Sequence, residues 1–161
     1  PELLALRDRA VTKSRGFNIG SKPRRIALPS ENDGVCEIVI TLNGQKADSI
    51  DLELQNEAGE KVVMTYNVSR NSLSFDRRNS GVTDFSHDFP AVTTAPTFNS
   101  DGKLCLRIFI DRSSIEVFES DGKFAMTNLV FPTKPYSSLS VSAKGGKARV
   151  DGIEVYSIKV K

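Results

Sequence analysis

The chain has 161 residues, of which 39% are hydrophobic and 26% are charged, and this composition predicts one soluble domain with a sizeable core. Its 22 basic and 20 acidic residues give a net charge of +2 and are scattered, which argues against a nucleic-acid partner, and no apolar run approaches the roughly 20 residues of a membrane-spanning helix. Two cysteines, Cys36 and Cys105, are too few for a disulfide scaffold or a thiolate zinc site, so we expect both thiols to be free. The chain does not open with a signal peptide, and its abrupt start at Pro1 without Met suggests a fragment of a longer protein.

Strand signals dominate the chain after its first residues. Residues 1–11 are the one helix-compatible stretch, because Pro1 is tolerated in a first helical turn, although the apolar stripe is short. Residues 36–42 and 49–55 carry apolar side chains at every second position, which predicts strands with one buried face. The expected inward residues are Cys36, Ile38, Ile40, Leu42, Ile50, Leu52 and Leu54. Further strand-like segments are 61–68, 103–111, 114–120, 123–131, 138–143 and 148–160.

Glycine turns separate these segments. Glycine supplies the positive φ angle that a tight hairpin turn needs, and Asn or Asp commonly precedes it. Many short strands with such turns predict an all-β, antiparallel sandwich or barrel. The turn dipeptides are Asn43-Gly44, Ala58-Gly59, Asp101-Gly102, Asp121-Gly122 and Gly145-Gly146.

Residues 107–118 predict a hairpin whose turn lies at Arg112-Ser113. The turn fixes which residues face each other across the two strands, and side chains two positions apart share a face. The expected pairs are Ile110–Ile115 and Ile108–Val117 on the core face, and Phe109–Glu116 and Arg107–Phe118 on the outer face.

Three charged residues beside this hairpin, Asp111, Arg112 and Glu116, raise the question of chemistry. Arg107 and Glu116 are diagonal neighbours in the predicted register and can form an ion pair, worth about 0–1 kcal/mol if exposed. Asp111 precedes the bend, where a carboxylate commonly accepts hydrogen bonds from backbone N–H groups two residues on. A purely structural role therefore explains the trio without a substrate.

Two long motifs carry a family resemblance. "LRIFIDRSSIEVFESDGKFAMTNLVFP" (106–132) and "SFDRRNSGVTDFSHDFP" (74–90) closely resemble the C-terminal β-sandwich module of glycoside hydrolase family 32, the levanases, invertases and inulinases that hydrolyse β-fructosides. The resemblance implies a lectin-like (concanavalin-like) jelly roll of two antiparallel sheets, packed in the parent enzyme against a five-bladed catalytic propeller. It also implies an interdomain linker remnant at 1–15, a single sandwich domain at 16–161, and a secreted or periplasmic parent.

The catalytic motifs of that family are missing from the chain. Retaining hydrolysis needs two carboxyl groups held roughly 5–5.5 Å apart, and the family takes them from a "WMNDPNG"-like stretch and an "EC" dipeptide, with an "RDP" aspartate holding the sugar. Here Arg7-Asp8 is followed by Arg9, and Cys36-Glu37 has the reverse order. We therefore expect no catalytic residue and no cofactor in this chain.

Carbohydrate binding is the alternative function. Fructan-binding modules resemble the same sandwich, and Asp, Glu and Arg side chains can hold sugar hydroxyl groups. The candidates are Arg112, Glu116, Asp84 and Asp88. Against this hypothesis, sugar sites commonly offer an aromatic platform, whereas many of the three Tyr and nine Phe here occupy strand positions that predict burial.

A module that packs against another domain should keep an apolar surface, because interdomain interfaces bury roughly 600–1,500 Å². The expected interface residues are Leu3, Leu4, Leu6, Phe75, Arg77 and Phe85. A patch of that size tends to find another partner, so self-association of the separate module is also expected. His87 lies between Asp84 and Asp88, but a surface loop held by its aromatic residues explains it better than a metal site.

Overall fold

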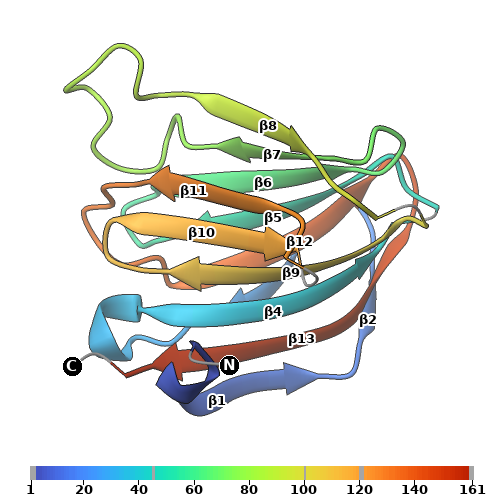
Figure 1. Cartoon of the computed structure of the whole chain (residues 1–161), viewed down its shortest axis with the longest axis horizontal. Coiled ribbons are helices and arrows are strands. Elements are labelled where there is room, and N and C mark those ends of the chain that lie inside the picture. The colour runs from blue at the N-terminus through green and yellow to red at the C-terminus, as the bar shows by residue number, and fades with distance from the viewer. Residues whose placement is uncertain (1–2, 45, 100, 120–121, 160–161) are drawn as a thin grey trace.

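The computed structural model describes residues 3–44, 46–99, 101–119 and 122–159, apart from the side chain of Leu3. Within these ranges the chain forms two antiparallel sheets, which Figure 1 shows as two layers with the seven-stranded sheet nearer the viewer. The seven-stranded sheet consists, in spatial order, of β1 (Arg7–Ser14), β13 (Ala148–Ile158), β4 (Cys36–Asn43), β9 (Lys103–Ile110), β10 (Ser114–Glu119) and β11 (Ala125–Leu129), with β2 (Phe17–Ile19) also paired to β13. The six-stranded sheet consists of β3 (Arg24–Ala27), β12 (Ser138–Lys144), β5 (Ser49–Gln55), β6 (Lys61–Asn67), β7 (Ser72–Asp76) and β8 (Val92–Pro96).

The predicted all-β, antiparallel two-sheet sandwich is confirmed, and its core lies between the sheets. Every residue that the alternation of 36–42 and 49–55 placed inward is fully buried. β4 and β5 belong to opposite sheets, and their neighbouring strands extend both layers of the core with the same period-2 pattern, with Leu106 and Ile108 on β9 as examples. Cys36 is buried and Cys105 is half-buried on the opposite face of its sheet, and both thiols are free.

The start of the chain differs from the expected helix. Only Leu3–Leu6 are helical, as the short 3-10 helix η1, and the chain enters β1 at Arg7. β1 pairs with β13 through two register shifts, one between Arg7 and Arg9 and one between Ala10 and Thr12. Each shift reverses the side-chain alternation, so the sequence shows no period-2 pattern there. Residues 7–14, which we expected within a linker, are an edge strand of the sandwich.

Several connections gather at one end of the sandwich, on the left in Figure 1. They are the short helix η2 (Glu31–Gly34), the β9–β10 turn, the segment from 130 to 137 and the long loop 77–91. This end therefore carries most of the residues that the sequence marked as candidates. Among the described residues no helix is both long and apolar enough to cross a membrane.

Candidate functional site

The β9–β10 hairpin has the predicted register, and each of the four expected pairs is present. The backbone N–H of Asp111 donates to the carbonyl of Ser114 at 2.9 Å and closes the turn. The Asp111 carboxylate accepts a hydrogen bond from the backbone N–H of Arg112 at 2.7 Å. Asp111 thus accepts a backbone hydrogen bond at the turn as expected, but from the next residue and not from two residues on.

The predicted ion pair between Arg107 and Glu116 of β10 is wrong, because Arg107 pairs instead with a carboxylate of β4, the strand on the opposite side of β9. Its Nε lies 3.1 Å from Oε1 of Glu37. β9 lies between β4 and β10. Phe109 of β9 is paired with Glu37 of β4 on one side and with Glu116 of β10 on the other. Arg107 therefore has one diagonal carboxylate on each side, and the sequence alone revealed only the one within the hairpin.

Glu37 is the centre of a charged cluster on the outer face of the seven-stranded sheet. Its carboxylate is fully buried and accepts two hydrogen bonds from Arg7, at 2.6 Å from Nε and 2.8 Å from Nη2. Arg7 reaches it across β13, with its guanidinium 4.0 Å from the ring centroid of Tyr156. The hydrogen bond with Glu37 raises the pKa of Arg7. Because two guanidinium groups occupy this carboxylate, its geometry suits a structural anchor between β1, β4 and β9 better than an acid or nucleophile.

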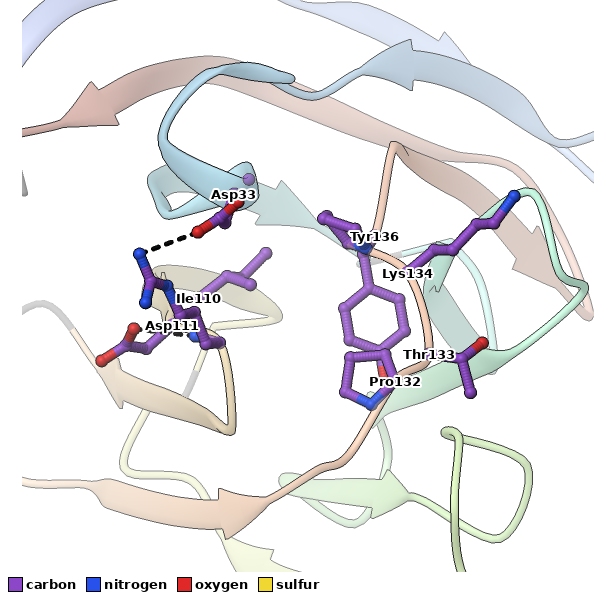
Figure 2. Close-up of a pocket in the computed structure, with 10 residues that line it drawn as sticks. Asp33, Ile110, Asp111, Pro132, Thr133, Lys134 and Tyr136 are labelled. Carbon is purple, nitrogen blue, oxygen red and sulfur yellow. Dashed lines mark hydrogen bonds and ion pairs between the residues drawn. The ribbon is translucent and has the colours of Figure 1, made fainter.

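A cavity of about 210 Å³, here named the end pocket, opens between η2, the β9–β10 turn and residues 132–136. One side carries Asp33, Asp111 and Arg112, and Arg112 Nη2 lies 2.7 Å from Asp33 Oδ2. Figure 2 shows Asp33 and Asp111 on one side of the opening and the segment of Pro132, Thr133, Lys134 and Tyr136 on the other.

A left-handed turn positions Asp33 at the pocket. Asn32 and Asp33 have φ angles of 52° and 57°, and Gly34 follows at 75°. Asx residues tolerate this region better than other side chains, and glycine adopts it freely. The Asn32 side chain donates to the carbonyl of Ile158 at 2.8 Å, which ties the turn to β13. The sequence reasoning missed Asp33, although Asn-Asp-Gly is a turn signal in its own right.

Three aromatic rings form a cluster beside the same end of the sandwich. The ring centroids of Phe85, Phe89 and Phe131 lie 4.7 to 5.6 Å apart. Arg77 holds the cluster, since its guanidinium lies 4.1 Å from the Phe89 ring centroid and donates to the carbonyls of Phe89 and Leu129, at 2.9 and 3.2 Å. The cluster therefore joins loop 77–91 of one sheet to the end of β11 in the other.

Much of this cluster is exposed to water. Phe85 is 59% exposed, and Phe131, Leu129 and Val82 are also exposed; the backbone N–H of Val82 donates to the carbonyl of Phe131 at 2.9 Å. We name these four side chains the aromatic patch. Phe131 was missed by the sequence reasoning because it follows β11, whereas Phe85 lies in the loop between β7 and β8 of the other sheet.

The four predicted carbohydrate-binding residues do not share one site. Arg112 lines the end pocket. Glu116 lines a second cavity, of about 190 Å³, together with Leu6 and Phe109. Asp84 and Asp88 are exposed on loop 77–91 and line neither cavity.

The predicted interface residues divide in a similar way. Leu4 and Leu6 are exposed near the start of the chain, and Phe85 and Arg77 belong to the cluster described above, whereas the side chain of Leu3 lies outside the described residues. Phe75 was wrongly placed at the surface. It is fully buried, because it is in phase with Leu73 on β7 and both point into the core.

No set of three or more His, Cys, Asp or Glu side chains among the described residues is arranged to hold a metal ion. His87 is exposed on loop 77–91. The candidate sites described in this part of the chain are therefore the end pocket, which is lined by side chains of both charges, and the aromatic patch.

Comparison with known proteins places this geometry in a family. The family described as "Glycosyl hydrolases family 32 C terminal" matches residues 2–157. A levanase of Bacillus sp. (strain L7) is 30% identical over 113 residues, which are 70% of this chain and 12% of the levanase. A fructan beta-fructosidase of Streptococcus mutans is 34% identical over 116 residues, covering 71% of this chain and 8% of that protein.

The fold agrees with solved structures of much longer chains. The crystal structure of exo-inulinase from Aspergillus awamori superposes with a TM-score of 0.81 at 22% identity, over 98% of this chain and 31% of the inulinase chain. This chain thus spans about a tenth of the curated relatives above and about a third of that structure. With the match extending over residues 2–157, the chain belongs to the C-terminal domain family of the family 32 glycosyl hydrolases.

Proposed function

We propose that this chain is the non-catalytic C-terminal domain of an enzyme that hydrolyses fructans or sucrose, and that it stabilises and positions a catalytic β-propeller of the same polypeptide. The match to the C-terminal family over residues 2–157 carries this proposal. The names of the relatives, a levanase and a fructan beta-fructosidase, supply the substrate class.

The arrangement of carboxylates supports a non-catalytic role. Hydrolysis of a glycoside needs an acid and a nucleophile or base on either side of the scissile bond. Glu37 is buried under two guanidinium groups, Asp33 is paired with Arg112, and Asp111 accepts a backbone hydrogen bond in its turn. Each of these carboxylates already has a structural partner, so none is placed to act on a sugar bond.

The aromatic patch is the surface that we assign to the contact with the propeller. A group of large apolar side chains that is exposed to water costs free energy unless another surface covers it. Arg77 supports this group by bonding to the carbonyls of Phe89 and Leu129, and the Phe89 ring contacts those of Phe85 and Phe131. Interfaces between domains of one chain bury roughly 600–1,500 Å², so the patch would form the centre of a larger contact. Leu4 and Leu6 offer a second, smaller apolar surface near the start of the chain.

Two measurements test this proposal. The purified 161-residue chain should release no fructose from sucrose, levan or inulin, and turnover above a control preparation would overturn it. In the full-length protein that carries this chain, the double substitution Phe85→Ser, Phe131→Ser should shorten the half-life of activity at elevated temperature and leave KM unchanged. Phe98→Ser is the matched control, because Phe98 is equally exposed but follows the opposite end of β8. Equal half-lives for the double variant and the control would contradict the assignment of the patch.

A further inference from the structure

The end pocket has the size of one sugar ring. Its volume of about 210 Å³ suits a small ligand. That space is too small for a chain of several sugars and smaller than the roughly 300–1,000 Å³ of sites for larger organic ligands.

Both walls of the pocket mix polar and apolar groups. Asp33, Asp111 and Arg112 lie on one side together with Ile110, and Figure 2 shows Thr133 and Lys134 on the other side together with Pro132 and Tyr136. A sugar ring suits a mixed lining of this kind, because its hydroxyl groups need donors and acceptors while its C–H groups pack against apolar atoms.

The charges that line the pocket cancel. Asp33 and Asp111 carry one negative charge each, and Arg112 and Lys134 carry one positive charge each. An anionic ligand would meet two carboxylates and a cationic ligand two basic groups, so the balance favours a neutral ligand. The guanidinium of Arg112 has five N–H donors, and the pairing of its Nη2 with Asp33 leaves others for a ligand.

Both walls are fixed before any ligand arrives. The Asn32–Gly34 turn is tied to β13, as described above. On the opposite side the backbone N–H and the hydroxyl of Thr133 donate to Glu60 Oε1, at 2.7 and 2.8 Å, and the Tyr136 hydroxyl donates to the carbonyl of Ser80 at 2.6 Å. A preformed site loses less conformational entropy on binding, which favours affinity for a small ligand.

We infer that the end pocket is a binding site for a single neutral sugar ring, held by hydrogen bonds from Arg112 and to Asp33 and Asp111. The identification of the sugar as a fructosyl unit rests on the proposed function. The inference of a single neutral ring rests on the size and charge of the pocket and does not depend on that proposal. Binding is weak, with a Kd on the order of 1 mM, because the nearest aromatic ring, that of Tyr136, is buried and offers little stacking surface.

The test is a titration of the 161-residue chain with fructose, followed by amide chemical shifts in NMR spectra. Fructose should shift the amides of residues 33, 34, 111, 112, 133, 134 and 136, and inorganic phosphate should not. Arg112→Ala should weaken the binding of fructose at least tenfold. Arg78→Ala is the matched control, because Arg78 is similarly exposed, at 60% against 63% for Arg112, and likewise lies 2.7 Å from an aspartate oxygen.

Three outcomes would overturn the inference: no shifts at up to about 100 mM fructose, a hundred times the expected Kd; shifts confined to residues outside the pocket; or stronger binding of phosphate than of fructose. An unchanged amide spectrum away from residues 33–34, 111–112 and 133–136 shows that Arg112→Ala is folded. Loss of the pocket inference leaves the thermal inactivation test of the aromatic patch unaffected, so the two proposals fail separately.

Discussion

Removing the charge of Glu37 should destabilise the domain more than any other single loss of charge discussed above. Glu37→Gln keeps the size of the side chain but leaves two guanidinium groups without a counter-charge. Breaking a buried ion pair by removing one partner costs about 3–5 kcal/mol. The side chains of Arg7 and Arg107 are 21% and 36% exposed and regain some hydration, so we expect a loss of about 2–4 kcal/mol in the free energy of unfolding.

Thermal unfolding followed by circular dichroism measures this loss. A domain of this size loses about 2–4 °C in Tm for each kcal/mol, so a loss of about 3 kcal/mol lowers Tm by about 6–12 °C. Glu31→Gln is the matched control, because Glu31 pairs with Arg9 of the same strand β1 at 2.9 Å, with side chains 65% and 40% exposed for Arg9 and Glu31. An exposed pair is worth about 0–1 kcal/mol. Equal shifts in Tm for the two variants would refute the anchoring role of Glu37.

The remaining predictions concern pH, a glycine and the patch. Burial raises the pKa of Tyr136, so the stability that its protonated hydroxyl contributes is complete below about pH 10 and is lost gradually as the pH rises from there toward the raised pKa. The advantage of about 1 kcal/mol over Tyr136→Phe should therefore shrink as the pH rises past 10, and a constant difference would contradict this. Gly81→Ala should lower the free energy of unfolding by about 2 kcal/mol or more, because φ is 152° and the added Cβ would lie 2.2 Å from the Phe131 carbonyl oxygen. The control Gly20→Ala, with open space around the added Cβ, should lower it by less than about 0.5 kcal/mol. Similar urea midpoints for the two variants would argue against the clash. Phe85→Ser should reduce the concentration-dependent self-association of the chain in sedimentation experiments, and no self-association of the native chain would contradict that prediction.

The sequence predicted the features that depend on neighbouring residues. Period-2 alternation identified β4 and β5 and the side chains that they bury. A single turn at Arg112-Ser113 sufficed for the register of the β9–β10 hairpin. In both cases the information lies within a few residues of chain, where steric rules act directly.

The features that depend on distant strands escaped sequence reasoning. Glu37 meets Arg107 only because β4 and β9 are neighbours in the sheet, and Arg7 meets Glu37 only across β13. The end pocket likewise combines Asp33, Arg112 and residues 132–136 from three separate connections. No local pattern contains these pairings, because they follow from the order of the strands in the sheet.

The most direct test of the central claim is hydrogen–deuterium exchange of the aromatic patch in two contexts. The claim is that this domain packs through Val82, Phe85, Leu129 and Phe131 against a catalytic domain of the same polypeptide. Backbone amides of residues 82–89 and 129–131 should exchange more slowly in the full-length protein than in the 161-residue chain, while those around Phe98 should exchange equally in both. Equal exchange of residues 82–89 and 129–131 in the two proteins would contradict the claim.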